Sequence, residues 1–449
     1  MTTLGWLFAA AFLLGAVRGG RRGLLLATAV TVPFYDSAML VVGQVGVQGW
    51  YVGLILYVAW SVLSKPRAEW VIARSAAPAL LVVYSLVVTL VAPIAFEGLR
   101  VVAPGIGLDE QVGQLAVYTE FTESNFAQLG YLILNVLLVY LNEVDRVVGR
   151  KFLGVAFGVG TLAATAAYFL NGAWPQEIFD NIPGGFYAEP TDRIRNPLAE
   201  PSHLGGLAAS TLPFFLVLAL QERGARRIAP LVLAACGVLL LVESASGTAI
   251  IGGGVGALAF LALAALFARQ SGNGVQPATI IIGLLATAAA IVIGPRVAAG
   301  IGGIVDSKLG SASLEARSFA DANGFSLLEE TNWVGIGLGT NRTSSLLSLL
   351  ASNIGVIGTL LFAVVIWRCV RNGLADPARM PAAAALVVLL GASAFSLANL
   401  ASPVMWALIA ACWVRTYPTT EAEQSGEMSS GDSIDAVKGR HRRRHSVTS

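Results

Sequence analysis

Residues 71–96 read VIARSAAPALLVVYSLVVTLVAPIAF, and this stretch decides the class of fold. Apart from Arg74, it contains no charged side chain. About 20 mostly apolar residues are enough for a helix to cross the hydrocarbon core of a bilayer. Residues 71–96 therefore predict a membrane-spanning helix.

The rest of the 449-residue chain has the same character. It is 55% hydrophobic and 12% charged, whereas soluble domains carry about 25% charged residues. Such a composition excludes a single soluble core, and it excludes a disordered chain, which needs low hydrophobicity and high net charge. Three cysteines are too few for a disulfide scaffold or a zinc ribbon. The composition predicts a protein that crosses the membrane many times.

We predict an all-α bundle of 12 or 13 transmembrane helices that occupies residues 1–416. The first span is short and could instead pair with the second as a hairpin. The predicted spans are 2–17, 23–43, 49–64, 71–96, 126–144, 152–171, 201–221, 228–245, 249–268, 277–295, 344–368, 380–397 and 400–415.

Lysine and arginine cluster in alternate short loops of this arrangement. The clusters are Arg18, Arg21 and Arg22; Lys65 and Arg67; Arg146, Arg150 and Lys151; Arg223, Arg226 and Arg227; and Arg368, Arg371 and Arg379. Loops rich in these residues stay in the cytoplasm, which predicts that long loops at 97–125, 172–200 and 296–343 lie outside. We expect the chemistry in these external loops, and a disordered cytoplasmic tail at 417–449 that can contact anionic lipid.

The predicted external loops carry arginines against this charge rule, among them Arg193, Arg195, Arg317 and Arg342. The planar guanidinium group binds phosphate through two parallel hydrogen bonds. These arginines therefore predict an external site for a phosphorylated lipid. The alternative is that each arginine pairs with a carboxylate of its own loop.

The densest group of candidate residues is Glu200-Pro201-Ser202-His203. Proline is favoured in the first turn of a helix, so Glu200 or its neighbour is expected to cap the span 201–221. Glu200 and His203 are three residues apart and share a helix face, where they could orient or deprotonate a sugar hydroxyl. The alternative is a carboxylate that stabilises the helix dipole beside a histidine bonded to a loop carbonyl.

Three further polar residues are candidates for the same pocket. Glu243 interrupts two apolar runs near the outer face, where an ionisable residue suggests a function, although it could instead pair with a loop arginine. Asn125, just before the span 126–144, and Gln128 within it lie on the same side of this helix. They either form hydrogen bonds between helices or line a polar cavity.

Two glycine-rich segments are interpreted differently. Residues 252–256, GGGVG, place small residues four apart and predict close helix packing. The glycines of residues 331–342, TNWVGIGLGTNR, predict a tight backbone path. Neither segment fits a phosphate loop or a dinucleotide fingerprint, which need a following lysine or a preceding strand.

Residues 115–415 resemble the superfamily of O-antigen ligases and Wzy-type O-antigen polymerases. The motifs that carry the resemblance are Glu200-Pro201-Ser202-His203-Leu204-Gly205, Ser244-x-Ser246-Gly247-Thr248, the loop of Arg317, and Asn332-x-x-Gly335-x-Gly337-x-Gly339. The resemblance implies a GT-C type bacterial glycosyltransferase of the plasma membrane. It would work on the external or periplasmic face, on undecaprenyl-diphosphate-linked glycans, with no cofactor, metal or nucleic acid.

From this resemblance we expect a polymerase of O-antigen, capsule or exopolysaccharide repeat units. Arg193, Arg195, Arg317 and Arg342 would hold the donor diphosphate, and Glu200 or His203 would position or deprotonate the acceptor hydroxyl. A chain-length regulator or a flippase of the same pathway is a further candidate partner. Ligases of the group carry an essential histidine in the late large loop, and residues 296–343 contain none, which favours the polymerase.

Other classes stay open. A ligase would transfer the glycan to a lipid, protein or cell-wall acceptor. A peptidoglycan-type polymerase would also use lipid-linked donors, a flippase or transporter would place its charges mid-membrane and show paired repeats, and a scaffold protein would tolerate neutralisation of every loop arginine.

Overall fold

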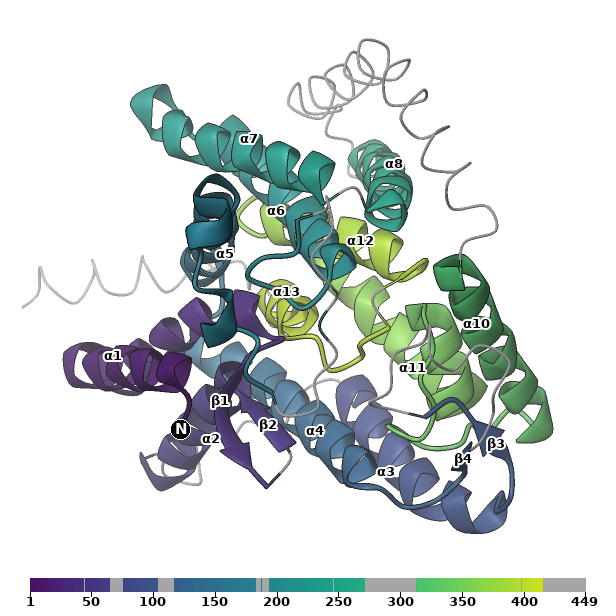
Figure 1. Ribbon diagram of the computed structural model, residues 1–449. Helices are drawn as coiled ribbons and strands as arrows, with labels where there is room; N and C mark the ends of the chain where they lie inside the picture. Colours follow the sequence, from purple (N-terminus) through teal and green to yellow (C-terminus); the bar gives the residue numbers. More distant parts are fainter. Residues whose placement is uncertain are drawn as a thin grey trace, which may run out of the picture. The chain divides into compact units, whose positions relative to one another are not determined.

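The computed structural model describes residues 1–43, 45–64, 76–103, 117–182, 187, 194–244, 246–270, 312–396 and 398–414 (Figure 1). Within these residues, eight helical segments are long and apolar enough to cross a membrane. In the same residues, three shorter apolar helices are Gly49–Ser64, Met380–Ser393 and Pro403–Trp413. The predicted all-α polytopic bundle is confirmed, and the chain is a multi-pass membrane protein. The predicted span 277–295 and the tail 417–449 lie outside the described residues.

The helices match most of the predicted spans to within a few residues. The α-helices are α1 Thr3–Thr28, α2 Gly49–Ser64, α3 Ala77–Ala95, α4 Glu123–Asp145, α5 Arg150–Leu170, α6 Pro201–Gln221, α7 Ile228–Glu243, α8 Gly247–Gln270, α10 Ala312–Glu330, α11 Leu346–Ala375, α12 Met380–Ser393 and α13 Pro403–Trp413. Short 3-10 helices are η1 Ala29–Phe34, η4 Asn171–Ala173, η5 Gln176–Ile178 and η6 Gly224–Arg227. Two antiparallel pairs of strands join β1 Ala38–Val42 to β2 Val45–Gln48 and β3 Arg100–Val101 to β4 Val117–Tyr118.

The first two predicted spans form one bent element. The helical path of α1 breaks at Gly20, which has φ +55°, and a Cβ at Gly15 would lie 2.5 Å from the carbonyl oxygen of Gly23. The two arms therefore pack together, as in the hairpin alternative. The predicted span 23–43 is wrong beyond Thr28, because η1, a turn and β1 follow.

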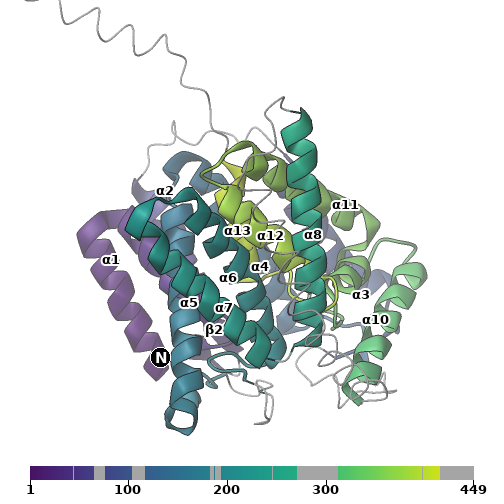
Figure 2. The ribbon, with the colours of Figure 1, turned by 90° about the horizontal axis from the view of Figure 1, so that it is seen from above.

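The predicted loop 296–343 also differs from the structure, because it contains a helix. Its residues Ala312–Glu330 form α10, which packs against α11 on the far side of the bundle from α1 (Figures 1 and 2). The hydropathy of α10 is too low for a span, and apolar periodicity gives little sign of such a polar helix. Arg317 consequently lies on a helix and not on a loop.

The short helix α13 lies in the middle of the described bundle, where it contacts α4, α11 and α12 (Figure 1). Every residue from Pro403 to Trp413 is buried, and a helix that is apolar all round is expected in such a place. The indole nitrogen of Trp406 donates a hydrogen bond of 2.6 Å to the carbonyl oxygen of Leu400. This bond fixes the start of α13 to the segment before it.

The glycines of residues 252–256 pack as predicted. A Cβ at Gly252 would lie 2.5 Å from the carbonyl oxygen of Gly391, and one at Gly256 would lie 2.7 Å from the Cα of Val388. The backbones of α8 and α12 are therefore in direct contact, as small residues permit in membranes. This contact sets the position of the C-terminal end of α12.

Charged helix ends gather at one end of the bundle. Asp145, at the C-terminal end of α4, is paired with Arg21 at 2.6 Å and accepts a hydrogen bond from Tyr57. Arg150, which opens α5, is paired with Glu222 after α6. Because α4 and α6 run in the same direction, their N-terminal ends share the other end of the bundle.

Candidate functional site

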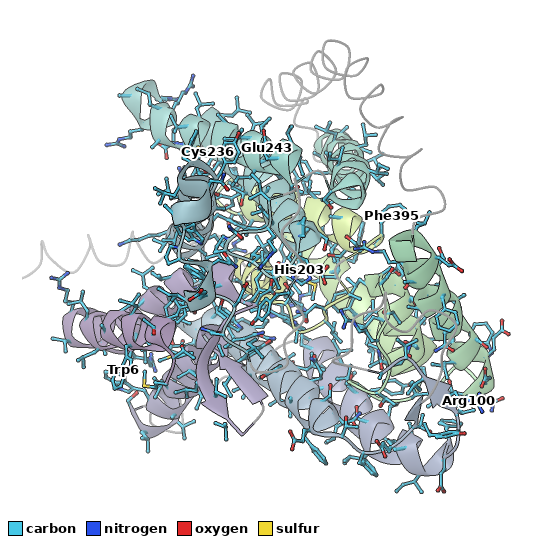
Figure 3. The ribbon with its side chains drawn as sticks, viewed as in Figure 1. Trp6, Arg100, His203, Cys236, Glu243 and Phe395 are labelled. Atoms are coloured by element: carbon cyan, nitrogen blue, oxygen red, sulfur yellow. The ribbon has the colours of Figure 1, made fainter. Side chains whose placement is uncertain are left out.

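A cavity of about 340 Å³ lies at this other end of the bundle. It opens among the N-terminal ends of α4, α6, α11 and α13 and the C-terminal end of α12. Its polar lining consists of Tyr35, Ser124, Gln128, Glu200, His203, Asn341, Arg342, Asn353, Ser393, Asn399 and Ser402, and its apolar lining includes Leu207, Leu349, Leu389, Val404 and Met405. His203 is near the centre of the view in Figure 3.

The start of α6 brings both predicted catalytic residues into the cavity. Glu200 is the N-cap residue, with extended backbone, and Pro201 is the first helical residue, as predicted. The Glu200 side chain makes no capping bond. Its Oε2 atom instead accepts a hydrogen bond of 2.9 Å from the Ser202 hydroxyl, so the carboxylate is held beside the histidine that follows it.

His203 has a carboxylate partner from a distant part of the chain. Its Nδ1 atom lies 2.7 Å from Oδ2 of Asp36, with the two side chains 27% and 13% exposed. The same Oδ2 atom accepts a hydrogen bond of 3.0 Å from the backbone N–H of Ala199. Asp36 therefore binds the start of α6 at two points.

Arg342 reaches the cavity at the end of the glycine-rich segment. Gly335, Gly337 and Gly339 have φ values of +93°, +93° and +76°, which L-residues with side chains rarely adopt. A Cβ at Gly339 would lie 2.6 Å from the carbonyl oxygen of Ser124. The predicted tight backbone path is confirmed, and it places Leu338, Gly339, Asn341 and Arg342 in the cavity wall.

Asp321 of α10 holds the chain just after Arg342. Its carboxylate accepts hydrogen bonds from the backbone N–H of Ser344 at 2.9 Å, the hydroxyl of Ser344 at 2.9 Å and the N–H of Ser345 at 3.1 Å. The backbone N–H of Arg342 itself donates to the carbonyl oxygen of Val102 at 3.1 Å. Hydrogen bonds therefore hold the backbone at Arg342 and directly after it.

The electrostatics of the cavity favour an ionised Glu200. Burial raises the pKa of its carboxyl, but His203, the Ser202 hydroxyl, Arg317 and Arg342 together lower the pKa below its usual range. Arg317 acts from α10, where it is half-buried. A site of this kind combines a carboxylate, an imidazole and a guanidinium group around one cavity.

The other predicted arginines have different positions. Arg195 binds Asp180 with both terminal nitrogens, at 3.0 and 2.7 Å, and it donates to the carbonyl oxygen of Leu198 at 3.2 Å. It does not line the cavity, so in this structure it pairs with a carboxylate, as in the alternative interpretation. Arg317 influences Glu200 without lining the cavity, and Arg193 lies outside the described residues.

Only one of the three predicted pocket residues lines the cavity. Gln128 lines the cavity, whereas Asn125 and Glu243 do not. Asn125 is buried and donates to the Leu338 carbonyl at 2.7 Å and to the Thr340 hydroxyl at 2.8 Å, so it holds the cavity wall from behind. Glu243 accepts a hydrogen bond from Tyr168 at 3.5 Å, and among the described residues it forms no ion pair.

Asp36 is the main residue that the sequence interpretation missed. It is the first carboxylate of the chain, and residues 1–64 contain no other. An ionisable residue within the predicted span 23–43 is by itself a sign of function. The residues Asn341 and Asn353 gave no such signal, because asparagine is common in turns and helix caps.

Comparison with protein-family models gives no match to this chain, and comparison with curated proteins gives no significant match. Within the described residues, no group of three or more His, Cys, Asp or Glu side chains is arranged to hold a metal ion.

Proposed function

We propose that the protein is a membrane glycosyltransferase that polymerises undecaprenyl-diphosphate-linked oligosaccharide repeat units. The observation that carries the proposal is the cavity in which Glu200, His203 and Arg342 meet among mostly apolar helices. The substrate class, undecaprenyl-diphosphate-linked glycans, is proposed from the resemblance of the Glu200–Gly205 motif to O-antigen ligases and polymerases. The proposed location is the external face of the plasma membrane.

The distribution of arginines along the bundle supports this location, because the arginines gather at the end opposite the cavity. On α4, α6, α11 and α12 the cavity residues are at one end of each helix. Cationic residues lie at or beyond the other end of each helix, at Arg146, Arg223, Arg371 and Arg379. Lysine and arginine collect on the cytoplasmic side. The cavity then opens outward, where lipid-linked glycans are joined without nucleotide sugars.

The proposed reaction is a single inverting displacement. An acceptor hydroxyl loses its proton to a base in the cavity, and its oxygen forms a bond to the anomeric carbon of the donor. The bond from that carbon to the diphosphate oxygen breaks, and the electron pair leaves with the diphosphate. Arg342 stabilises the charge that develops there, and Glu200 accepts hydrogen bonds from the acceptor sugar.

The test uses purified protein in liposomes with the host's pool of undecaprenyl-linked glycans and no nucleotide sugar. Products are separated by size for the wild type, for Arg342→Ala and for the control Arg371→Ala, which removes an exposed arginine at the opposite end of α11. We expect a ladder of lengthening lipid-linked glycans with the wild type and the control, and its loss with Arg342→Ala.

Other outcomes would contradict the polymerase. Glycan on a second acceptor, without a ladder, would show a ligase. Lipid-linked glycan that crosses the bilayer unchanged would show a flippase. A ladder of normal yield from Arg342→Ala would remove the diphosphate role of Arg342.

A further inference from the structure

We infer that His203 is the proton acceptor of the proposed reaction and that Asp36 is its positioning residue, which binds Nδ1 and directs Nε2 to the acceptor hydroxyl. The inference rests on the proposed function. It concerns a residue that reaches His203 through tertiary structure alone, since Asp36 precedes His203 by 167 positions.

The contacts around Asp36 leave its carboxylate little freedom. It follows η1 in a turn that leads into β1, and its Oδ2 atom is fixed by the N–H of Ala199 at 3.0 Å as well as by His203 at 2.7 Å. Tyr35 holds the histidine from a second side. The centroids of the Tyr35 and His203 rings are 5.8 Å apart, and the Tyr35 hydroxyl donates to the His203 carbonyl oxygen at 3.4 Å.

A carboxylate at this place decides which ring nitrogen carries the proton. A neutral imidazole has one N–H donor and one acceptor nitrogen, and a carboxylate can only accept. In the neutral form of His203, which is the form that can accept a proton, the ring proton is therefore on Nδ1 and the lone pair is on Nε2. Nε2 has no hydrogen-bond partner among the described residues, and the ring lines the cavity.

Glu200 is less suited to take the proton. The pKa of its carboxyl is lowered although burial raises it, and a carboxylate with a low pKa is a weak base near neutrality. The charged or titratable side chains that act on Glu200 are His203, Arg317 and Arg342. Those that act on His203 are Asp36, Glu200 and Arg342. The two acidic residues thus have separate roles, one behind the imidazole and one beside it.

The principal variant is Asp36→Asn, which keeps an oxygen for the N–H of Ala199 and removes the negative charge. We expect its rate of ladder formation to fall by about 10²-fold or more, in the range of lost general-base catalysis. Asp36→Glu should recover part of the rate. The control is Glu222→Gln, the same kind of change in an ion pair at the opposite end of the bundle.

A second readout does not depend on activity. The chain has three histidines, and two of them, His441 and His445, lie in the tail. With both changed to Gln, ¹⁵N-histidine NMR of the protein in detergent observes His203 alone. We expect a strongly deshielded proton on Nδ1, typical of a charge-assisted hydrogen bond, which is lost in Asp36→Asn and kept in Glu222→Gln.

The two readouts separate the possible failures. An unchanged Nδ1 signal and a normal ladder in Asp36→Asn would overturn the inference. A ladder that survives His203→Gln but not Glu200→Gln would assign the base to Glu200 and overturn it as well. A wild type with the Asp36-dependent signal but no ladder would support the positioning contact and reject the proposed polymerase.

Discussion

Arg195 shows at the scale of one residue how partners determine a role. Its side chain is 12% exposed, and its guanidinium group binds both carboxylate oxygens of Asp180. We expect Arg195→Lys to lower the free energy of unfolding by roughly 1–3 kcal/mol, because an ammonium group cannot reproduce the paired hydrogen bonds. Thermal unfolding in detergent measures this change.

The matched variant is Asp180→Asn, which breaks the same pair from the other side. If Arg195 only positions the loop before α6, both variants should lose similar stability and similar product yield. Loss of the ladder in Arg195→Lys, with a normal ladder in Asp180→Asn, would instead show that Arg195 itself binds the donor diphosphate.

The shifted pKa of Glu200 makes a prediction about pH. Because the pKa of this carboxyl is lower in the folded protein, the ionised form stabilises the fold above the pKa of the unfolded chain, about 4.3. That stabilisation is lost as the pH falls through the folded pKa. We expect Glu200→Gln to be less stable than the wild type at neutral pH, and the difference to shrink below about pH 4.

The measurement is the melting temperature of both proteins across this range of pH. Glu222→Gln is the control for a general effect of removing a carboxylate, since Glu222 lies outside the cavity. A difference between wild type and Glu200→Gln that stays constant with pH would contradict the prediction.

At the scale of elements, the contact between α8 and α12 determines the shape of the cavity. Gly252 faces the backbone of Gly391, and Leu389 and Ser393 on the same stretch of α12 line the cavity. We expect Gly252→Val to push α12 outward, and to lower both the melting temperature and the product yield.

The same helix provides the control. A Cβ at Gly254 would have no atom within 4 Å, so Gly254→Ala should be neutral or stabilise the helix by up to about 1 kcal/mol. Similar melting temperatures and yields for the two variants would show that the close approach of α8 and α12 is not needed.

At the scale of the whole molecule, the location of the cavity depends on the orientation of the bundle. The side chain of Tyr118 is 51% exposed near the cavity end, and Gly224 lies in the exposed turn between α6 and α7 at the cationic end. In a variant without the native cysteines Cys236, Cys369 and Cys412, single new cysteines at positions 118 and 224 show on which side of the membrane each end of the bundle lies.

We expect a membrane-impermeant maleimide to label Tyr118→Cys in intact spheroplasts, and to label Gly224→Cys only after the membrane is permeabilised. The positive residues near position 224 are the physical reason, because they favour the cytoplasmic side. The reverse pattern of labelling would place the cavity in the cytoplasm and would reject the proposed external reaction.

The sequence alone determined the class of fold, most helix boundaries and the start of α6. Apolar length sets where a helix crosses a membrane, and a proline in the first turn marks where one begins. These signals depend on residues that are adjacent in the sequence, so they can be recognised without the tertiary structure. The helix α10 was not predicted, because it is polar. The end of the helix before η1 was not predicted, because Pro33 and Asp36 interrupt a run that is otherwise apolar.

Tertiary structure alone decided which polar residues share the cavity. Glu200, His203, Gln128 and Arg342 meet there, whereas Arg195 is occupied by Asp180 and Asn125 supports the wall from behind. The pairing of Asp36 with His203 joins residues on different elements, and no spacing rule connects them. The type and charge of a side chain are known from the sequence, but its hydrogen-bond and ion-pair partners depend on how the helices pack.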